Sequence, residues 1–165
     1  MSFDAKKLYT NVNLNRVVSH VLDCVYKTPS LFFDEKDDFG NPFPIPPRSN
    51  FRIFIQNVLK NFNIIENNLG YYKQIGGLAM GSHLSGSLSN IFIHLMENTV
   101  VTKLLKDKTI VHWQRYTEWS TVRYAYDFFC ICEKGAVDLI LNKINAWDSK
   151  LTFTVENLVN DEIKF

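Results

Sequence analysis

The sequence has no long apolar run, no excess of charge of one sign and few cysteines. Its apolar stretches, such as residues 89–96, are short and interrupted by polar side chains. A membrane helix needs roughly 20 apolar residues, so no membrane span is expected. The amino terminus lacks the basic and then apolar pattern of a secretory signal. These absences predict an intracellular protein, and its 165 residues suffice for one compact domain.

The charged and metal-ligating residues are equally uninformative about a partner. Eighteen basic residues against seventeen acidic ones leave a net charge of +1, which is not typical of an autonomous nucleic-acid binder. The four histidines lack the short spacings of a zinc site. Cys130 and Cys132 lie in an apolar stretch where they cannot readily bridge. With Cys24 they are expected to be reduced core residues.

Apolar residues recur at helical spacing in four segments. The first runs through residues 17–25, after two asparagines that can cap it, and the second, capped by Ser49, through 51–62. Two more helices are predicted around residues 84–96 and 137–147. Residues 34–47 are rich in charge, glycine and proline and predict a surface loop.

Between the helices the pattern predicts strands. Residues 62–75 are predicted to form a hairpin. Apolar residues alternate in 121–133 and predict a second, buried hairpin whose middle is Tyr124-Ala125-Tyr126-Asp127. Alternation in 151–155 predicts a strand, and a turn at 160–161 leads to a further strand with Ile163 and Phe165, which completes a last hairpin. Such a mixed order predicts an α+β fold, an antiparallel sheet with helices packed on one face.

Two carboxylates are candidates for chemistry. Asp4 precedes an aromatic residue, Tyr9, by five positions, and Asp127 lies far along the chain in the aromatic hairpin. Phosphoryl transfer by two metals needs carboxylates from different strands to meet, so that two Mg²⁺ ions about 4 Å apart can hold the attacking and leaving oxygens. Asp4 and Asp127 are spaced in the sequence to do so.

Four separated motifs carry a family resemblance that spans almost the whole chain in the right order. They are Leu8-Tyr-Thr-Asn-Val12 after Asp4, Tyr72-Lys-Gln-Ile-Gly-Gly-Leu-Ala-Met-Gly-Ser82 with Leu84-Ser85 and Asn90, Arg123-Tyr124 with Asp127-Phe128, and Leu151-Thr-Phe-Thr-Val-Glu156 with Ile163-Lys-Phe165. Together they resemble the palm of Penelope-like retroelement reverse transcriptases, which are RNA-directed DNA polymerases.

The resemblance implies a polymerase palm fold, Mg²⁺ as cofactor, and an RNA template, a DNA primer and a deoxynucleoside triphosphate as partners. Asp4 and Asp127 would be metal ligands, and Tyr9 would screen the 2′ position of the incoming nucleotide or, equally, serve as a core tyrosine. The turn over template and nucleotide would include the residues Gln74, Gly76, Met80, Gly81 and Ser82, where missing side chains let the backbone approach closely.

The sequence also departs from that family. The family hairpin reads Tyr-x-Asp-Asp, and here Tyr126 stands at the position of the first aspartate. A phenol is neutral at pH 7 and offers one weak oxygen, so it cannot replace a carboxylate on Mg²⁺. His83 and Gly86 replace the prolines that usually flank Leu84-Ser85. The fingers, the thumb and the endonuclease often found with this family have no counterpart in residues 1–165.

We therefore expect a partial reverse-transcriptase palm that is inactive as it stands. The alternative is a non-catalytic module that reuses the fold to bind nucleic acid or protein. Its candidate surface is residues 110–119, where two tryptophans, a tyrosine and Arg115 could stack on bases or on a partner protein. The same segment could instead pack on its own sheet.

Overall fold

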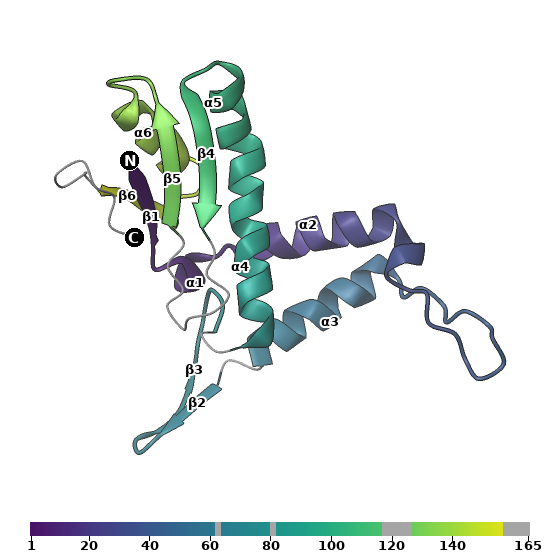
Figure 1. Cartoon of the computed structure of the whole chain (residues 1–165). Coiled ribbons are helices and arrows are strands. Elements are labelled where there is room, and N and C mark those ends of the chain that lie inside the picture. The colour runs from purple at the N-terminus through teal and green to yellow at the C-terminus, as the bar shows by residue number, and fades with distance from the viewer. Residues whose placement is uncertain (62–63, 80–81, 117–126, 157–165) are drawn as a thin grey trace.

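The computed structural model describes residues 1–61, 64–79, 82–116 and 127–156, and its centre is a four-stranded antiparallel sheet (Figure 1). The strands are β1 (Ser2–Lys6), β4 (Ile110–Tyr116), β5 (Asp127–Cys132) and β6 (Thr152–Glu156), in the order β4-β5-β1-β6. Helices separate β1 from β4 and β5 from β6. The sheet thus follows a β-α-β-β-α-β course, the split βαβ arrangement.

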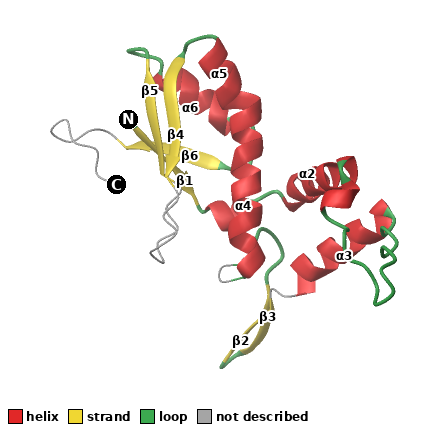
Figure 2. Ribbon diagram, turned by 45° about the vertical axis from the view of Figure 1, so that its right-hand side comes forward, coloured by secondary structure: helices red, strands yellow, loops and turns green. Residues whose placement is uncertain are grey.

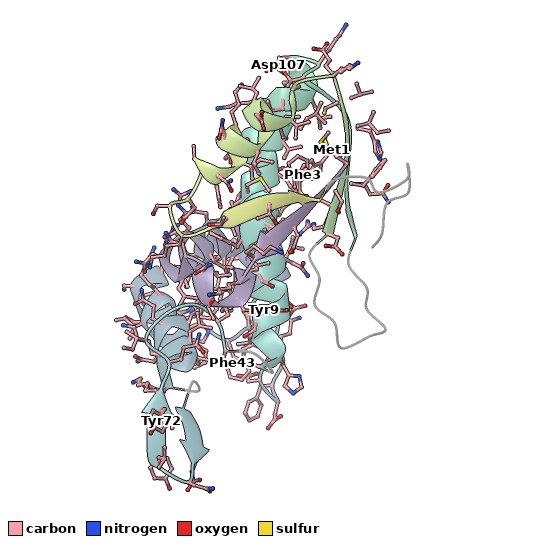
Figure 3. All side chains as sticks on the ribbon, turned by 90° about the vertical axis from the view of Figure 1, so that its left-hand side faces the viewer. Met1, Phe3, Tyr9, Phe43, Tyr72 and Asp107 are labelled. Carbon is pink, nitrogen blue, oxygen red and sulfur yellow. The ribbon has the colours of Figure 1, made fainter. Side chains whose placement is uncertain are left out.

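Helices cover one face of this sheet (Figure 3). A continuous rod forms from α4 (His83–Met96), the π-helix η2 (Glu97–Val101) and α5 (Thr102–Lys106), and α6 (Val137–Asn145) lies beside it. The side chains between the two layers are fully buried; from the strands they include Phe3, Phe128 and Phe153. The predicted α+β class and the antiparallel sheet are confirmed.

The strand register explains which side chains enter that layer. Phe3 lies opposite Phe128, and the rings of Phe128 and Phe153 meet edge to face at 5.5 Å. Successive side chains of a strand point to opposite faces, so every second residue of β1 and β5 faces the helices. The residues between them face the other side of the sheet.

The remaining elements extend away from the sheet (Figure 2). After the short α1 (Leu8–Asn11) come α2 (Leu14–Lys27) and a 3-10 turn, η1 (Pro29–Leu31); the side chain of Asn13 caps α2 by accepting from the amide of Arg16 at 3.3 Å. Beyond the loop lie α3 (Arg48–Asn61) and the hairpin of β2 (Ile64–Asn67) and β3 (Gly70–Lys73). We call α3 with this hairpin the arm.

Three local predictions need correction. The helix predicted to be capped by Ser49 begins at Arg48, because the amide of Phe51 already donates to the carbonyl of Pro47. The strand paired with β5 is β4, so the hairpin does not lie within residues 121–133 alone. Cys24 is exposed on α2, whereas Cys130 is buried and Cys132 half-buried, so only part of the cysteine prediction is right.

No helix in the described part of the chain is long and apolar enough to cross a membrane. The turn predicted at residues 160–161 and the strand beyond it lie outside the described residues.

Candidate carboxylate site

The structure brings together the two carboxylates that the sequence singled out. Asp4 on β1 is the direct cross-strand partner of Asp127 on β5. Their neighbours Phe3 and Phe128 are also partners and are fully buried under the helices. Because directly opposite residues of antiparallel strands share a face, both carboxylates lie on the face away from the helices.

Burial of the phenylalanine pair is what holds the carboxylates in place. A slip of one residue in the pairing of β1 with β5 would exchange the faces of every side chain and expose Phe3 or Phe128. The aromatic layer therefore determines the register, and the register brings Asp4 opposite Asp127. Both carboxylates remain partly accessible on a rigid pair of central strands.

Like charges directly opposite one another destabilise a pair of strands. Lys6 lies two residues after Asp4 on the same face, and its ammonium nitrogen is 2.5 Å from Oδ2 of Asp4. This ion pair offsets part of the repulsion between the carboxylates. Lys6 could have been predicted to face Asp4, because residues two positions apart in a strand point to the same face.

These donors do not fit a two-metal centre. Two carboxylates supply oxygen ligands of the kind Mg²⁺ prefers, but one of them is already paired with an ammonium. Among the described residues, no three His, Cys, Asp or Glu side chains lie close enough to hold a metal ion. Tyr126, at the position of the missing aspartate, lies outside the described residues.

The glycine-rich turn that precedes α4 lies against the segment that follows β1. The amide of Leu78 donates to the carbonyl of Tyr9 at 2.7 Å. Gly77 has a φ of +70°, and a Cβ there would lie 2.5 Å from the carbonyl oxygens of both Tyr9 and Thr10. Only glycine allows this approach. Gly77, and not the predicted Gly76, is therefore the glycine at which the turn contacts the Tyr9 segment.

The other predicted turn residues have structural partners where they are described. The side-chain amide of Gln74 donates to the carbonyls of Gly76, at 2.6 Å, and Leu78, at 3.2 Å, and so holds the turn closed. A Cβ at Gly76 would meet no atom within 4 Å, so that glycine is not required by packing. Ser82 precedes the first residue of α4. Met80 and Gly81 lie outside the described residues.

Tyr9 is a core residue in this structure. It lies in α1, where Figure 3 labels it. Only 9% of its surface is exposed to solvent. It belongs to the cluster that also contains Phe3 and Leu78. Of its two predicted roles, the packing role is the one its burial supports.

The candidate binding segment at residues 110–119 packs on its own molecule where it is described. The ring of Trp113 lies 5.2 Å from that of Phe128, and its indole nitrogen donates to Glu97 at 3.0 Å. Arg115 forms an ion pair with the same carboxylate, also at 3.0 Å, and donates to the carbonyl of Asn90. These side chains tie β4 to the helical rod. They are not free to stack on a ligand.

Comparison with protein-family models, with curated proteins and with solved structures finds no match to this chain. The resemblance to a polymerase palm therefore rests on the four sequence motifs, and the activity it implies is a proposal.

Proposed function

We propose that this chain is a reverse-transcriptase palm whose carboxylate site no longer supports nucleotidyl transfer. The observation that carries the proposal is the cross-strand pair of Asp4 and Asp127, on the face of the antiparallel sheet that points away from α4 and α6. Two-metal polymerisation needs carboxylates from separate strands at such a place. The β-α-β-β-α-β course and the contact between the Gly77 turn and Tyr9 join motifs far apart in the sequence.

Loss of activity follows from the donor set. Tyr126 stands where the family has an aspartate, and the ammonium of Lys6 occupies part of the coordination space of Asp4. A phenol and an ammonium cannot neutralise or orient a pair of Mg²⁺ ions. Loss of a primary metal ligand costs several kcal/mol of transition-state stabilisation.

A primer-extension assay tests the proposal directly. The purified chain is given an RNA template, a DNA primer and all four deoxynucleoside triphosphates, with Mg²⁺ or Mn²⁺. No extension is expected in either metal. Primer extension by the unmodified chain that is abolished by Asp4→Asn would contradict the proposal that the chain is inactive.

Metal binding gives a readout that does not depend on activity. Mn²⁺ binding, followed by electron paramagnetic resonance, should be weak in the unmodified chain and roughly tenfold tighter in Tyr126→Asp, because the third carboxylate is restored. Adding Lys6→Met to that variant should tighten binding again, since the competing ammonium is removed. Asp4→Asn in the Tyr126→Asp background is the matched control. Equal affinity in all four proteins would refute the assignment of the carboxylate pair as a degenerate metal site.

The alternative, a non-catalytic binding module, draws its support from a different surface than residues 110–119. Large apolar side chains of the arm are exposed, among them Phe54, Tyr71 and Leu69. An interaction through the arm is compatible with an inactive palm.

A further inference from the structure

The β2–β3 hairpin projects from the body of the molecule (Figures 1 and 2). Within the described residues it forms a sheet of only two strands. An isolated two-stranded ribbon is marginally stable in water. The unpaired amides and carbonyls along its edges are a template for pairing with another strand.

Both faces of the hairpin carry exposed aromatic side chains. Tyr71 is 75% exposed and Tyr72, labelled in Figure 3, is 49% exposed. As neighbours in one strand they point to opposite faces. Ile64, opposite Lys73 on the Tyr71 face, is also exposed. A partner strand paired at the edge would satisfy the unpaired backbone groups and place its own side chains beside those on both faces.

The register tells which edge groups of β3 are available. Asn67 pairs with Gly70 across a two-residue loop, and such a loop is closed by a hydrogen-bonded pair. Hydrogen-bonded and non-hydrogen-bonded pairs then alternate along the ribbon. Tyr72 therefore bonds inward to β2, whereas Tyr71 and Lys73 direct their amides and carbonyls outward.

We propose that β3 pairs antiparallel with β3 of a second copy of this chain, about a twofold axis at Tyr72. Tyr71 then faces the partner's Lys73, and Lys73 faces the partner's Tyr71. Both residues have outward backbone groups, so the arrangement forms four main-chain hydrogen bonds. Such an isologous twofold contact is the commonest form of self-association. The proposal does not depend on the assignment of the carboxylate pair.

Charge disfavours two competing registers, and a third, centred on Tyr71, has only one hydrogen-bonded pair within β3. Pairing centred on Lys73 would bring two ammonium groups together, and pairing of β2 edges centred on Glu66 would bring two carboxylates together. With the axis at Tyr72, each ammonium instead meets a tyrosine ring, a favourable cation–π geometry. The net charge of the chain is only +1, so two copies repel one another little.

The first test is the mass of the protein in solution. Sedimentation velocity from about 5 µM to about 500 µM should detect a rise from 19.2 kDa toward twice that mass, with weak affinity because the contact is small. Tyr71→Pro removes an outward amide and should keep the chain monomeric. Tyr71→Thr keeps that amide and favours a strand, so it should still dimerise, more weakly.

The second test reads the register by cross-linking and does not require a proline. In a Cys24→Ser background, Tyr72→Cys places two thiols across the twofold axis, within the Cα separation of a disulfide. Mild oxidation should yield a covalent dimer. Tyr71→Cys in the same background faces the partner's Lys73, so it should yield several-fold less. The Cys24→Ser protein by itself measures the contribution of the remaining cysteines.

Three outcomes would overturn the proposal. The chain could remain monomeric at the highest concentration, or cysteines at 71 and 72 could cross-link equally. It could also bind a twelve-nucleotide oligouridylate through Tyr71 without dimerising, which would make single-stranded nucleic acid the occupant. Fluorescence anisotropy with the labelled oligonucleotide, on the unmodified chain and on Tyr71→Thr, distinguishes that case.

Discussion

The sheet and the arm use similar side chains in opposite ways. In the sheet, Phe3, Phe128 and Phe153 are almost completely removed from solvent. On the arm, Phe54 is 62% exposed and Leu69 is 85% exposed, and the only buried residue of α3 is Leu59. The sheet buries one face under the helices, whereas α3 packs against α2 and leaves part of its apolar surface exposed.

The difference shows what an apolar pattern predicts and what it does not. The stripe of residues 51–62 is as clear in the sequence as the alternation in the strands, yet only part of it is covered. A pattern specifies which side of an element is apolar, but the burial depends on a second element that packs there. Large exposed apolar patches mark interaction surfaces, and the arm carries one.

Truncation of one aromatic residue in each region should give the largest difference in stability. Phe128→Ala should lower the free energy of unfolding by about 3–5 kcal/mol, because it opens a cavity beside Trp113 and Phe153. Phe54→Ala on the arm should cost about 1 kcal/mol at most, because most of that ring is in water. Urea unfolding followed by circular dichroism measures both. Equal losses would mean that the arm is packed as the sheet is.

Two adjacent glycines test where the turn meets the sheet. Gly77→Ala should destabilise the fold by about 2 kcal/mol or more, since its Cβ would collide with two backbone carbonyls at a positive φ. Gly76→Ala is the matched control and should change stability by less than about 0.5 kcal/mol, because nothing lies near its Cβ. A larger loss of stability for Gly76→Ala than for Gly77→Ala would contradict the close contact at Gly77.

Two ion pairs extend the comparison to charge. Glu97→Gln leaves the largely buried Arg115 without its counter-charge and should cost about 2 kcal/mol. Asp23→Asn breaks the exposed pair with Arg48 at the side of the arm and should cost about 0.5 kcal/mol or less. Thermal and urea unfolding of both variants provide the measurement. A larger loss at Asp23 would show that the arm is held by charge.

The buried cysteine adds a pH dependence to the stability of the sheet. Burial, followed by the neighbouring Cys132, raises the pKa of the Cys130 thiol from 9.0 to about 12. Between these two pH values the folded state keeps a proton that the unfolded chain releases. The contribution of Cys130 to the free energy of unfolding is therefore fully present below pH 9.0 and is lost as the pH rises toward about 12.

At neutral pH the same burial should make thiol chemistry selective. Ellman's reagent should modify the exposed Cys24 rapidly and Cys130 only after unfolding. Cys24→Ser should remove the fast phase, and Cys130→Val should leave it unchanged. A fast phase that decreases in Cys130→Val would contradict the assignment of Cys130 as inaccessible.

Much of the fold could be predicted from local pattern. The helices α2, α4 and α6 and the β2–β3 hairpin follow from periodicity and turn residues, since these signals lie within one element. The partner of β5 could not be predicted, because strand pairing joins segments whose separation in the sequence carries no signal. Residues 110–116 and 127–132 pair as antiparallel neighbours, and this pairing is visible only in the structure.

Residue type and spacing were enough to predict the α+β class, to select Asp4 and Asp127 as candidate carboxylates, and to show that Tyr126 departs from the Tyr-x-Asp-Asp hairpin of the family that the motifs resemble. Tertiary structure decided that Asp4 lies opposite Asp127, that Gly77 and not Gly76 touches the Tyr9 segment, and that Trp113 and Arg115 are held by Glu97. The physical reason is that residue type and spacing specify what a side chain can do. Which groups it meets depends on register and burial, which arise only when distant strands and helices pack together.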